Sequence, residues 1–294
     1  MDISAGTNLR GAGHMVLMTF SFTCGDALVR LATQDLALFQ VVFLRGCLSC
    51  LFLAMLLWVT GQWRVQLSGR TKRLITLRSG AEVCAMIPFF IALTHMPFAN
   101  ITALLQTLPL TLTLAGALFL GEPVGWRRLA AILVGFVGVL LIVQPGGDGF
   151  SGYSLLMLLA VACLTVRDLT TRRIPQEVPV LLLSFTMAAF ATAAAGVLSV
   201  TEEWQPVGTA QGGLILGASI MVMGGYTFVA LAMRNGEIGF VTPFRYMALV
   251  WAVFLGFMLF GEWPDTLTWI GSSIVVATGL YTLYREQIRR RSTD

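Results

Sequence analysis

Two stretches in the two halves of the chain carry the same polar pattern. The stretch from Thr23 to Asp35 reads TCGDALVRLATQD, and the stretch from Thr165 to Glu177 reads TVRDLTTRRIPQE. Thr, Asp, Arg, Gln and a final acidic residue recur at the same spacing, at a constant offset of 142. A second match, at an offset of 140, aligns Ala92, Thr102, Gly121 and Glu122 with Ala232, Thr242, Gly261 and Glu262. The pattern predicts a tandem duplication.

The residues around these stretches are too apolar for a water-soluble protein. Of 294 residues, 56% are hydrophobic and only 12% are charged, with a mean hydropathy of +0.80. A bilayer core of about 30 Å requires roughly 20 apolar residues per helix. The sequence therefore predicts an all-α polytopic membrane protein with ten transmembrane helices, at Gly13–Leu31, Ala37–Thr60, Ser79–Leu93, Pro97–Leu120, Trp126–Val143, Tyr153–Thr171, Val180–Val200, Gly212–Met233, Gly239–Phe260 and Leu267–Tyr284.

Each half holds five predicted helices, and this odd number inverts the second half in the membrane. We predict a cytoplasmic tail at residues 1–12, a first five-helix repeat at 13–148, a second and inverted repeat at 149–285, and a basic cytoplasmic tail at 286–294. Inverted repeats are typical of alternating-access transporters, whose site lies between the halves near the bilayer midplane.

The basic residues predict the orientation of the chain. With a cytoplasmic N-terminus, the loops on that side contain Arg10, Arg64, Arg70, Lys72, Arg73, Arg78, Arg127, Arg128, Arg172, Arg173, Arg234, Arg285, Arg289, Arg290 and Arg291, and the opposite loops contain no lysine or arginine. This asymmetry predicts a bacterial-type inner-membrane protein with both termini in the cytoplasm. Because the basic residues occur in short runs between apolar segments, the net charge of +4 does not indicate a nucleic-acid partner.

Several short motifs resemble those of EamA-type, ten-helix members of the drug/metabolite transporter superfamily. They are Phe43-Leu44-Arg45-Gly46, Gly121-Glu122, Gly261-Glu262 and the glycine-rich segment from Leu129 to Val143. The resemblance covers Gly13 to Arg285. It implies transport of a small metabolite, such as an amino acid, a nucleotide-like compound, riboflavin or S-adenosylmethionine. It also implies a central cavity lined by the first, third and fourth helices of each half.

Charged residues inside the predicted spans are candidate gating or coupling residues, because each costs about 3 kcal/mol in a bilayer. Asp26 and Arg30 are four residues apart and are predicted to pair, as are Asp168 and Arg172 in the second half. Asp26 and Arg30 form either a structural ion pair or a contact with substrate, and the two pairs together are candidate symmetric gates. Glu82 either loads a proton or binds Arg78; Arg167 is a further charge within a span.

A second group of residues is predicted to bind the substrate. Arg245 follows Pro243, which opens the ninth helix, so the guanidinium either holds a carboxylate or phosphate or extends to the cytoplasmic headgroups. Arg45 lies deep in the second helix. Aromatic and amide side chains complete the predicted pocket, although each alternatively faces lipid or a neighbouring helix: Phe89, Phe90, Gln106, Tyr226, Tyr246 and Trp251.

Two further features concern bending and packing. Pro109 lies within the fourth helix, and its repeat equivalent is Leu249, which predicts that the two halves bend differently. The spacings Gly213-x-x-x-Gly217 and Ala131-x-x-x-Gly135 predict close helix contacts, within a monomer or in a homodimer.

The remaining motifs argue against an enzyme. The chain has no H-E-x-x-H and no G-x-x-x-x-G-K-[ST], and Cys47 and Cys50 lack a second cysteine pair. We expect no catalytic residue, metal or cofactor. The predicted function is secondary active transport of a small polar or amphipathic metabolite (amino-acid-like, S-adenosylmethionine-like or riboflavin-like) by alternating access, with protons as a candidate coupling ion. An intramembrane enzyme and a non-transporting scaffold are the alternatives.

Overall fold

A computed structural model describes residues 5–121, 125–145, 151–235 and 238–291, which form helices and no strand. The order is α1 (Ala5–Ala32), α2 (Leu38–Val59), η1 (Gln62–Arg64), α3 (Gly69–His95), α4 (Phe98–Leu105), α5 (Leu108–Leu120), α6 (Trp126–Val143), α7 (Gly152–Thr171), α8 (Val180–Ser199), α9 (Thr209–Asn235), α10 (Ile238–Val241), η2 (Thr242–Tyr246), α11 (Met247–Phe260) and α12 (Thr266–Arg291).

The predicted all-helical membrane fold is confirmed. In the part of the chain that the structure describes, nine segments are long and apolar enough to span a bilayer, and the tenth, in α6, is apolar over the shorter stretch Leu129–Val143. The third helix begins earlier than its apolar segment predicts, at Gly69 rather than Ser79. Ser68 explains the difference, because its hydroxyl accepts a hydrogen bond from the Thr71 amide (3.2 Å) and caps the helix.

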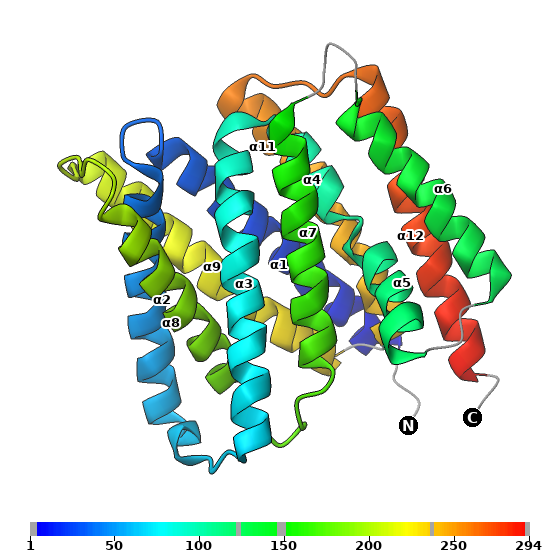
Figure 1. Cartoon of the computed structure of the whole chain (residues 1–294), viewed down its shortest axis with the longest axis horizontal. Coiled ribbons are helices and arrows are strands. Elements are labelled where there is room, and N and C mark those ends of the chain that lie inside the picture. The colour runs from blue at the N-terminus through cyan, green and yellow to red at the C-terminus, as the bar shows by residue number, and fades with distance from the viewer. Residues whose placement is uncertain (1–4, 122–124, 146–150, 236–237, 292–294) are drawn as a thin grey trace.

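Helices of one half pack mainly against helices of the other half. The principal pairs are α1 with α9, α3 with α7, α2 with α8, α6 with α12 and α4 with α11. Figure 1 shows α2 and α8 on one flank of the bundle and α6 and α12 on the other, with α3 and α7 between them. If each helix is replaced by its repeat equivalent in the other half, the α1–α9 pair becomes the α7–α3 pair. The α2–α8, α6–α12 and α4–α11 pairs each stay the same. The inverted orientation of the second repeat stays a prediction.

The start of α1 and the end of α12 lie at the same end of the bundle (Figure 1). Exposed tryptophans occur near the ends of several helices: one set lies at the end of α2 (Trp58), in η1 (Trp63) and at the start of α6 (Trp126), and the other lies in the α8–α9 connection (Trp204), the α11–α12 connection (Trp263) and the start of α12 (Trp269). Figure 1 shows the end of α2 and the start of α6 at the end of the bundle that holds the termini, and the start of α12 at the other end. Tryptophan is enriched where a membrane meets water. The distribution fits two membrane interfaces, while the side that faces the cytoplasm stays a prediction.

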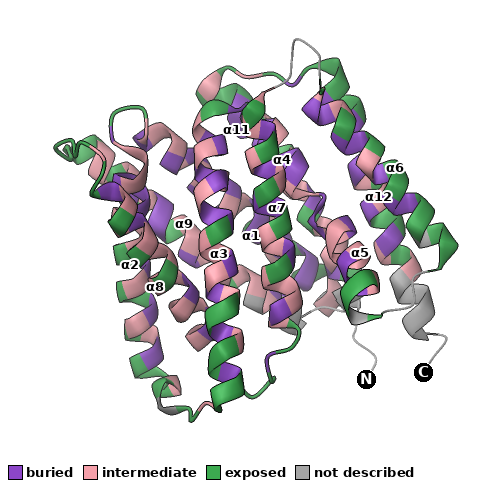
Figure 2. Cartoon of the chain, in the orientation of Figure 1, coloured by how far each residue is buried: buried purple, intermediate pink, exposed green. Residues whose placement is uncertain are grey.

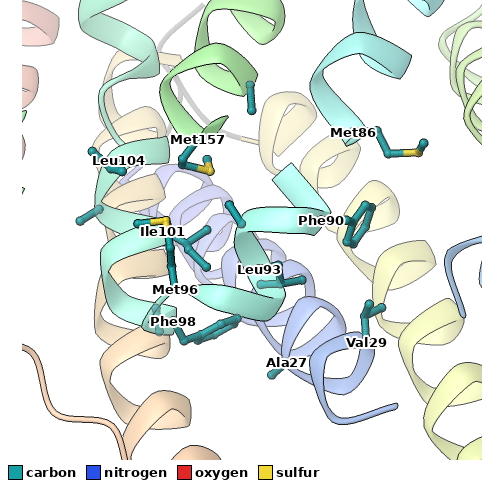
Figure 3. Packing of buried hydrophobic residues seen from close by; sticks show 14 of the residues in the cluster. Ala27, Val29, Met86, Phe90, Leu93, Met96, Phe98, Ile101, Leu104 and Met157 are labelled. Carbon is teal, nitrogen blue, oxygen red and sulfur yellow. The ribbon is translucent and has the colours of Figure 1, made fainter. Parts of the chain in front are cut away.

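Apolar side chains cover the outside of the bundle as well as its interior. Figure 2 shows exposed residues along the outward faces, and they include Leu51 (70% exposed) and Val197 (71%). Such surfaces are stable only against lipid tails. The main core lies where α1, α3, α4 and α7 meet, and Figure 3 shows Phe98, Ile101 and Leu104 of α4 beside Met157 and Leu93.

The fourth and ninth spans are both broken at repeat-equivalent positions. The first break lies at Gln106 and Thr107, between α4 and α5. The second is η2, whose last residue, Tyr246, aligns with Gln106 at an offset of 140. Pro109 and Pro243 lie close to these breaks, and each lacks an amide N–H and so leaves a helix carbonyl without its usual partner. That the two halves bend differently stays a prediction.

Candidate functional site

Arg245 lies at the break of the ninth span. The side-chain amide of Gln106 donates a hydrogen bond to the Arg245 carbonyl (3.0 Å), so Arg245 lies at the same depth as the first break, inside the span Phe98–Phe119. Its side chain is exposed, and its charge interacts with those of Arg167 and Asp168 on α7. The side chain thus lies among charged residues in the interior of a span, and its contact with cargo stays a prediction.

Ion pairs between α3 and α7 lie beside Arg245. Glu82 of α3 accepts a hydrogen bond from Arg167 at 2.8 Å, and the Nε of Arg167 is 2.8 Å from Asp168. The side chains of these three residues are between 20% and 27% exposed. Arg78 donates to the Thr171 hydroxyl (2.9 Å) and the Leu183 carbonyl (3.2 Å). Glu82 thus pairs with Arg167 across the halves, rather than with Arg78 on its own helix.

A second set of polar residues lies on α1, α2 and α9. The guanidinium of Arg45 interacts electrostatically with Asp26 and Tyr226, and its central carbon lies 5.1 Å from the ring centroid of Phe90. Tyr226 also interacts with Glu82 and with the arginines of the first set. Tyr226 therefore joins the two sets into one central polar network, which comprises Asp26, Arg45, Arg78, Glu82, Arg167, Asp168, Tyr226 and Arg245.

Four predicted substrate residues have structural neighbours instead. Tyr246 is buried, and its hydroxyl lies where a side chain at Gly279 would be. Trp251 packs edge-on against Phe20 (5.2 Å between centroids) and Phe89 against Phe90 (5.1 Å), while Gln106 links the two breaks. Their proposed contact with cargo stays untested. The sequence marks Arg167 as a charge within a span but gives it no partner, and it names Arg78 only as an alternative partner of Glu82.

Arg30 forms a different ion pair from the one predicted. Both of its terminal nitrogens bind Glu262, at 2.6 and 3.0 Å, rather than Asp26 four residues before it. Glu262 also accepts the backbone N–H of Phe98 at the start of α4 (2.8 Å). We call these three residues the outer latch, because they join α1, α4 and the α11–α12 connection.

The second glycine-glutamate motif, Gly261-Glu262, ends a helix and also supplies the carboxylate of the outer latch. Gly121 and Gly261 both terminate helices with φ of 65°, a left-handed conformation that glycine adopts readily. Glu262, however, is partly buried in the outer latch. The repeat aligns Arg30 with Arg172 and Glu262 with Glu122; Arg172 is exposed at the end of α7, and Glu122 lies outside the described residues. Whether the predicted symmetric gates exist stays open to experiment.

Replacing Glu262 by Gln should destabilise the protein by about 1.5–3 kcal/mol, because a bidentate, charge-assisted contact with Arg30 is lost. Thermal unfolding in lipid nanodiscs measures the loss, and Glu203→Gln, an exposed acidic residue in the α8–α9 connection, is the matched control. In a double-mutant cycle, adding Arg30→Gln should cost little more. Additive losses would show that the two side chains act independently.

Comparison with known proteins gives the family of the chain. The EamA-like transporter family matches residues 9–144 and again residues 151–284. The pseudopaline exporter CntI of Pseudomonas aeruginosa is 28% identical over 267 residues, which cover 89% of this chain and 91% of the exporter. The S-adenosylmethionine uptake transporter of Rickettsia conorii is 24% identical over 289 residues (98% and 97%), and a riboflavin transporter of Rhizobium johnstonii is 29% identical over 204 residues (68% and 66%).

A solved crystal structure shares the fold. It superposes with a TM-score of 0.60 at 18% identity and covers 92% of this chain and 97% of its own. Together with the family match over both halves, the all-helical membrane fold identifies a non-enzymatic transporter of metabolites. The chain belongs to the EamA-like transporter family.

Proposed function

We propose that this protein is a secondary active transporter for a small polar metabolite that carries a carboxylate, and that Arg245 binds this carboxylate. The observation that carries the proposal is the charge of the central polar network, in which four guanidinium groups face three carboxylates. Arg245 takes part in none of the ion pairs between described residues. An anionic group on the cargo would balance the surplus charge and occupy the planar fork of the guanidinium.

The relatives support a metabolite but differ in the compound for which they are named, namely pseudopaline, S-adenosylmethionine and riboflavin. The choice of cargo within this range therefore rests on the chemistry of the site. Tyr226 offers a hydroxyl and an aromatic face, and it packs edge-on against Phe22 at 5.4 Å. A cargo with an anionic end and a flat or apolar part would match Arg245 and Tyr226 together.

Alternating access by two inverted repeats is part of the same proposal. The exchange-symmetric helix pairs, the two breaks at equivalent positions and the doubled family match support it. The outer latch is one candidate gate, because it joins elements of both halves at one end of the bundle. Glu82, Asp26 and Asp168 are candidate proton carriers, since a carboxylate that faces arginines changes partner when it is protonated.

The proposed location is the inner membrane, with both termini in the cytoplasm. The end of the bundle that holds the start of α1 also holds Lys72, Arg127 and Arg173. Positive residues near the ends of spans favour the cytoplasmic side. Both a monomer and a homodimer are compatible with this arrangement.

The test is uptake into proteoliposomes that contain the purified protein. Compounds that stabilise the protein against heating are selected from a panel of amino acids, nucleotides, riboflavin, S-adenosylmethionine and carboxylates, and each is paired with its methyl ester where one exists. We expect saturable uptake of a carboxylate and at least tenfold weaker uptake of its ester. Dependence on an imposed pH gradient would identify protons as the coupling ion. Equal transport of acid and ester would contradict the carboxylate site, and no transport at all would favour a scaffold.

A further inference from the structure

A groove separate from the central polar network opens between α3, α5, α6 and α7. It encloses about 790 Å³. The end of the groove near the middle of the bundle contains Thr107, just before α5, Thr111 of α5 and Val161 of α7, and we call it the inner end. The outer end contains Leu77, Phe119 and Arg173. The hydroxyls of Thr111 and Thr165 share a hydrogen bond of 2.8 Å at the inner end. None of the residues of the central polar network lines the groove.

The groove has the length of one bilayer leaflet. Along α7, a helix of 20 residues, its lining runs from Leu158, six residues after the helix start, to Arg173, just beyond the helix end. Fifteen residues of helix correspond to about 22 Å, whereas half of the hydrocarbon core is about 15 Å. The groove therefore extends from near the bilayer midplane to the headgroup region at the end where α1 begins and α12 ends.

The walls of the groove suit a hydrocarbon rather than a polar cargo. Most lining residues are apolar, and the threonine hydroxyls have partners inside the bundle. Thr107 donates to the Leu104 carbonyl (2.6 Å) and Thr170 to the Val166 carbonyl (2.8 Å). Of Thr111 and Thr165, one hydroxyl donates to the other, and the accepting hydroxyl donates to a carbonyl of its own helix, Leu108 (3.0 Å) or Val161 (2.8 Å). Hydroxyls that are already satisfied offer little to a polar ligand. An alkyl chain fills such a space without leaving a buried polar group unpaired.

Basic residues lie at the mouth of the groove. Arg173 lines it and is exposed. Arg70 is exposed at the start of α3, on the same helical face as Leu74 and Leu77, which also line the groove. We propose that the groove binds an anionic phospholipid of this leaflet, with one acyl chain between α5 and α7 and the net negative charge of the headgroup at Arg173. Each arginine near a membrane surface favours an anionic lipid about fivefold.

The experiment titrates delipidated protein with phosphatidylglycerol and with phosphatidylcholine of the same chain length, and native mass spectrometry measures the bound lipid. Ala162 lines the groove and is exposed, so Ala162→Trp should fill the groove and lower phosphatidylglycerol affinity at least tenfold. Ala193→Trp, at an exposed alanine of α8 outside the groove, should leave the affinity unchanged.

A second pair of variants tests the headgroup. Arg173→Gln should lower phosphatidylglycerol affinity about fivefold with little effect on phosphatidylcholine. The matched control, Lys72→Gln, removes an exposed charge near the same membrane surface that does not line the groove, and should have less than a twofold effect. Equal losses in these two variants would reduce the effect to general surface charge and overturn the proposal.

The position of the chain is tested independently of affinity. Phosphatidylglycerol with a photoreactive group at the end of one acyl chain should label residues 158–165 at the inner end of the groove. Labelling spread over the apolar surface, or unchanged lipid binding in Ala162→Trp, would overturn the proposal. If Ala162→Trp instead blocks metabolite uptake while lipid binding persists, the groove is a path for cargo and not a lipid site.

Discussion

Replacing Arg245 by Gln is expected to lower kcat/KM for uptake at least about thirtyfold, while insertion and thermal stability stay close to those of the wild type. Loss of one partner from a buried, hydrogen-bonded charge pair costs about 2–5 kcal/mol, and the lower value corresponds to about thirtyfold. Folding should survive because Arg245 forms none of the ion pairs between described residues, and its carbonyl, not its side chain, binds Gln106.

Two further variants separate charge from geometry at this position. Arg245→Lys keeps the positive charge but loses the planar fork, so we expect an intermediate loss of uptake. Arg73→Gln removes an exposed arginine at the start of α3 and should transport normally. Normal uptake by correctly inserted Arg245→Gln protein would exclude Arg245 as the cargo anchor and shift attention to Arg45.

Replacing Gly271 by Leu is expected to destabilise the fold by about 3 kcal/mol or more. A Cβ atom at Gly271 would lie 2.6 Å from the carbonyl oxygen of Gly138 and 3.2 Å from the amide nitrogen of Ile142. These are backbone atoms of α6, which no side-chain rotation relieves, so α6 and α12 would have to separate. The close approach is reciprocal, because a Cβ atom at Gly138 would lie 2.8 Å from the Gly271 carbonyl oxygen.

Thermal unfolding in nanodiscs measures this effect against Gly213→Leu. Gly213 is exposed on α9, and a Cβ atom there meets nothing within 4 Å, so the control changes the same residue type without a clash. Gly271→Ala should fall between the control and the leucine variant. If the Gly271 and Gly213 leucine variants unfold at the same temperature, α6 and α12 do not depend on this backbone contact.

Length and periodicity of the apolar segments predict the helices well, because each helix is decided by residues near one another in the chain. Contacts between distant segments are not predictable in the same way. The sequence pairs Arg30 with Asp26 on one helix, but its partner Glu262 lies 232 residues away. Of the two predicted small-residue spacings, Gly213 meets no neighbour, but a Cβ atom at Gly217 would lie 3.3 Å from Leu28 and one at Gly135 would lie 2.9 Å from the Thr278 hydroxyl. Gly138 and Gly271 approach each other from different helices, and neither belongs to these spacings.

The candidate site follows the same rule. Apolar segments that contain a charge predicted most of the central polar network, since a charge in a bilayer needs a partner. The sequence does not show which residue is the partner. It offers a proton or Arg78 for Glu82, whereas in the structure Glu82 binds Arg167. The neighbours of aromatic residues are not predictable from the sequence, because an aromatic residue within an apolar segment can contact cargo or another helix. In the structure Tyr246 packs against α12 and Trp251 against α1.

The hydrogen bond from Gln106 to the Arg245 carbonyl fastens the bend of one repeat to the bend of the other. This bond contributes about 1 kcal/mol, so it favours but does not force a joint position of the two breaks, one of which carries the residue proposed to hold the cargo. Under the alternating-access proposal, the two repeats would then move as linked halves with this contact between them, and a movement of either half would change the surroundings of Arg245.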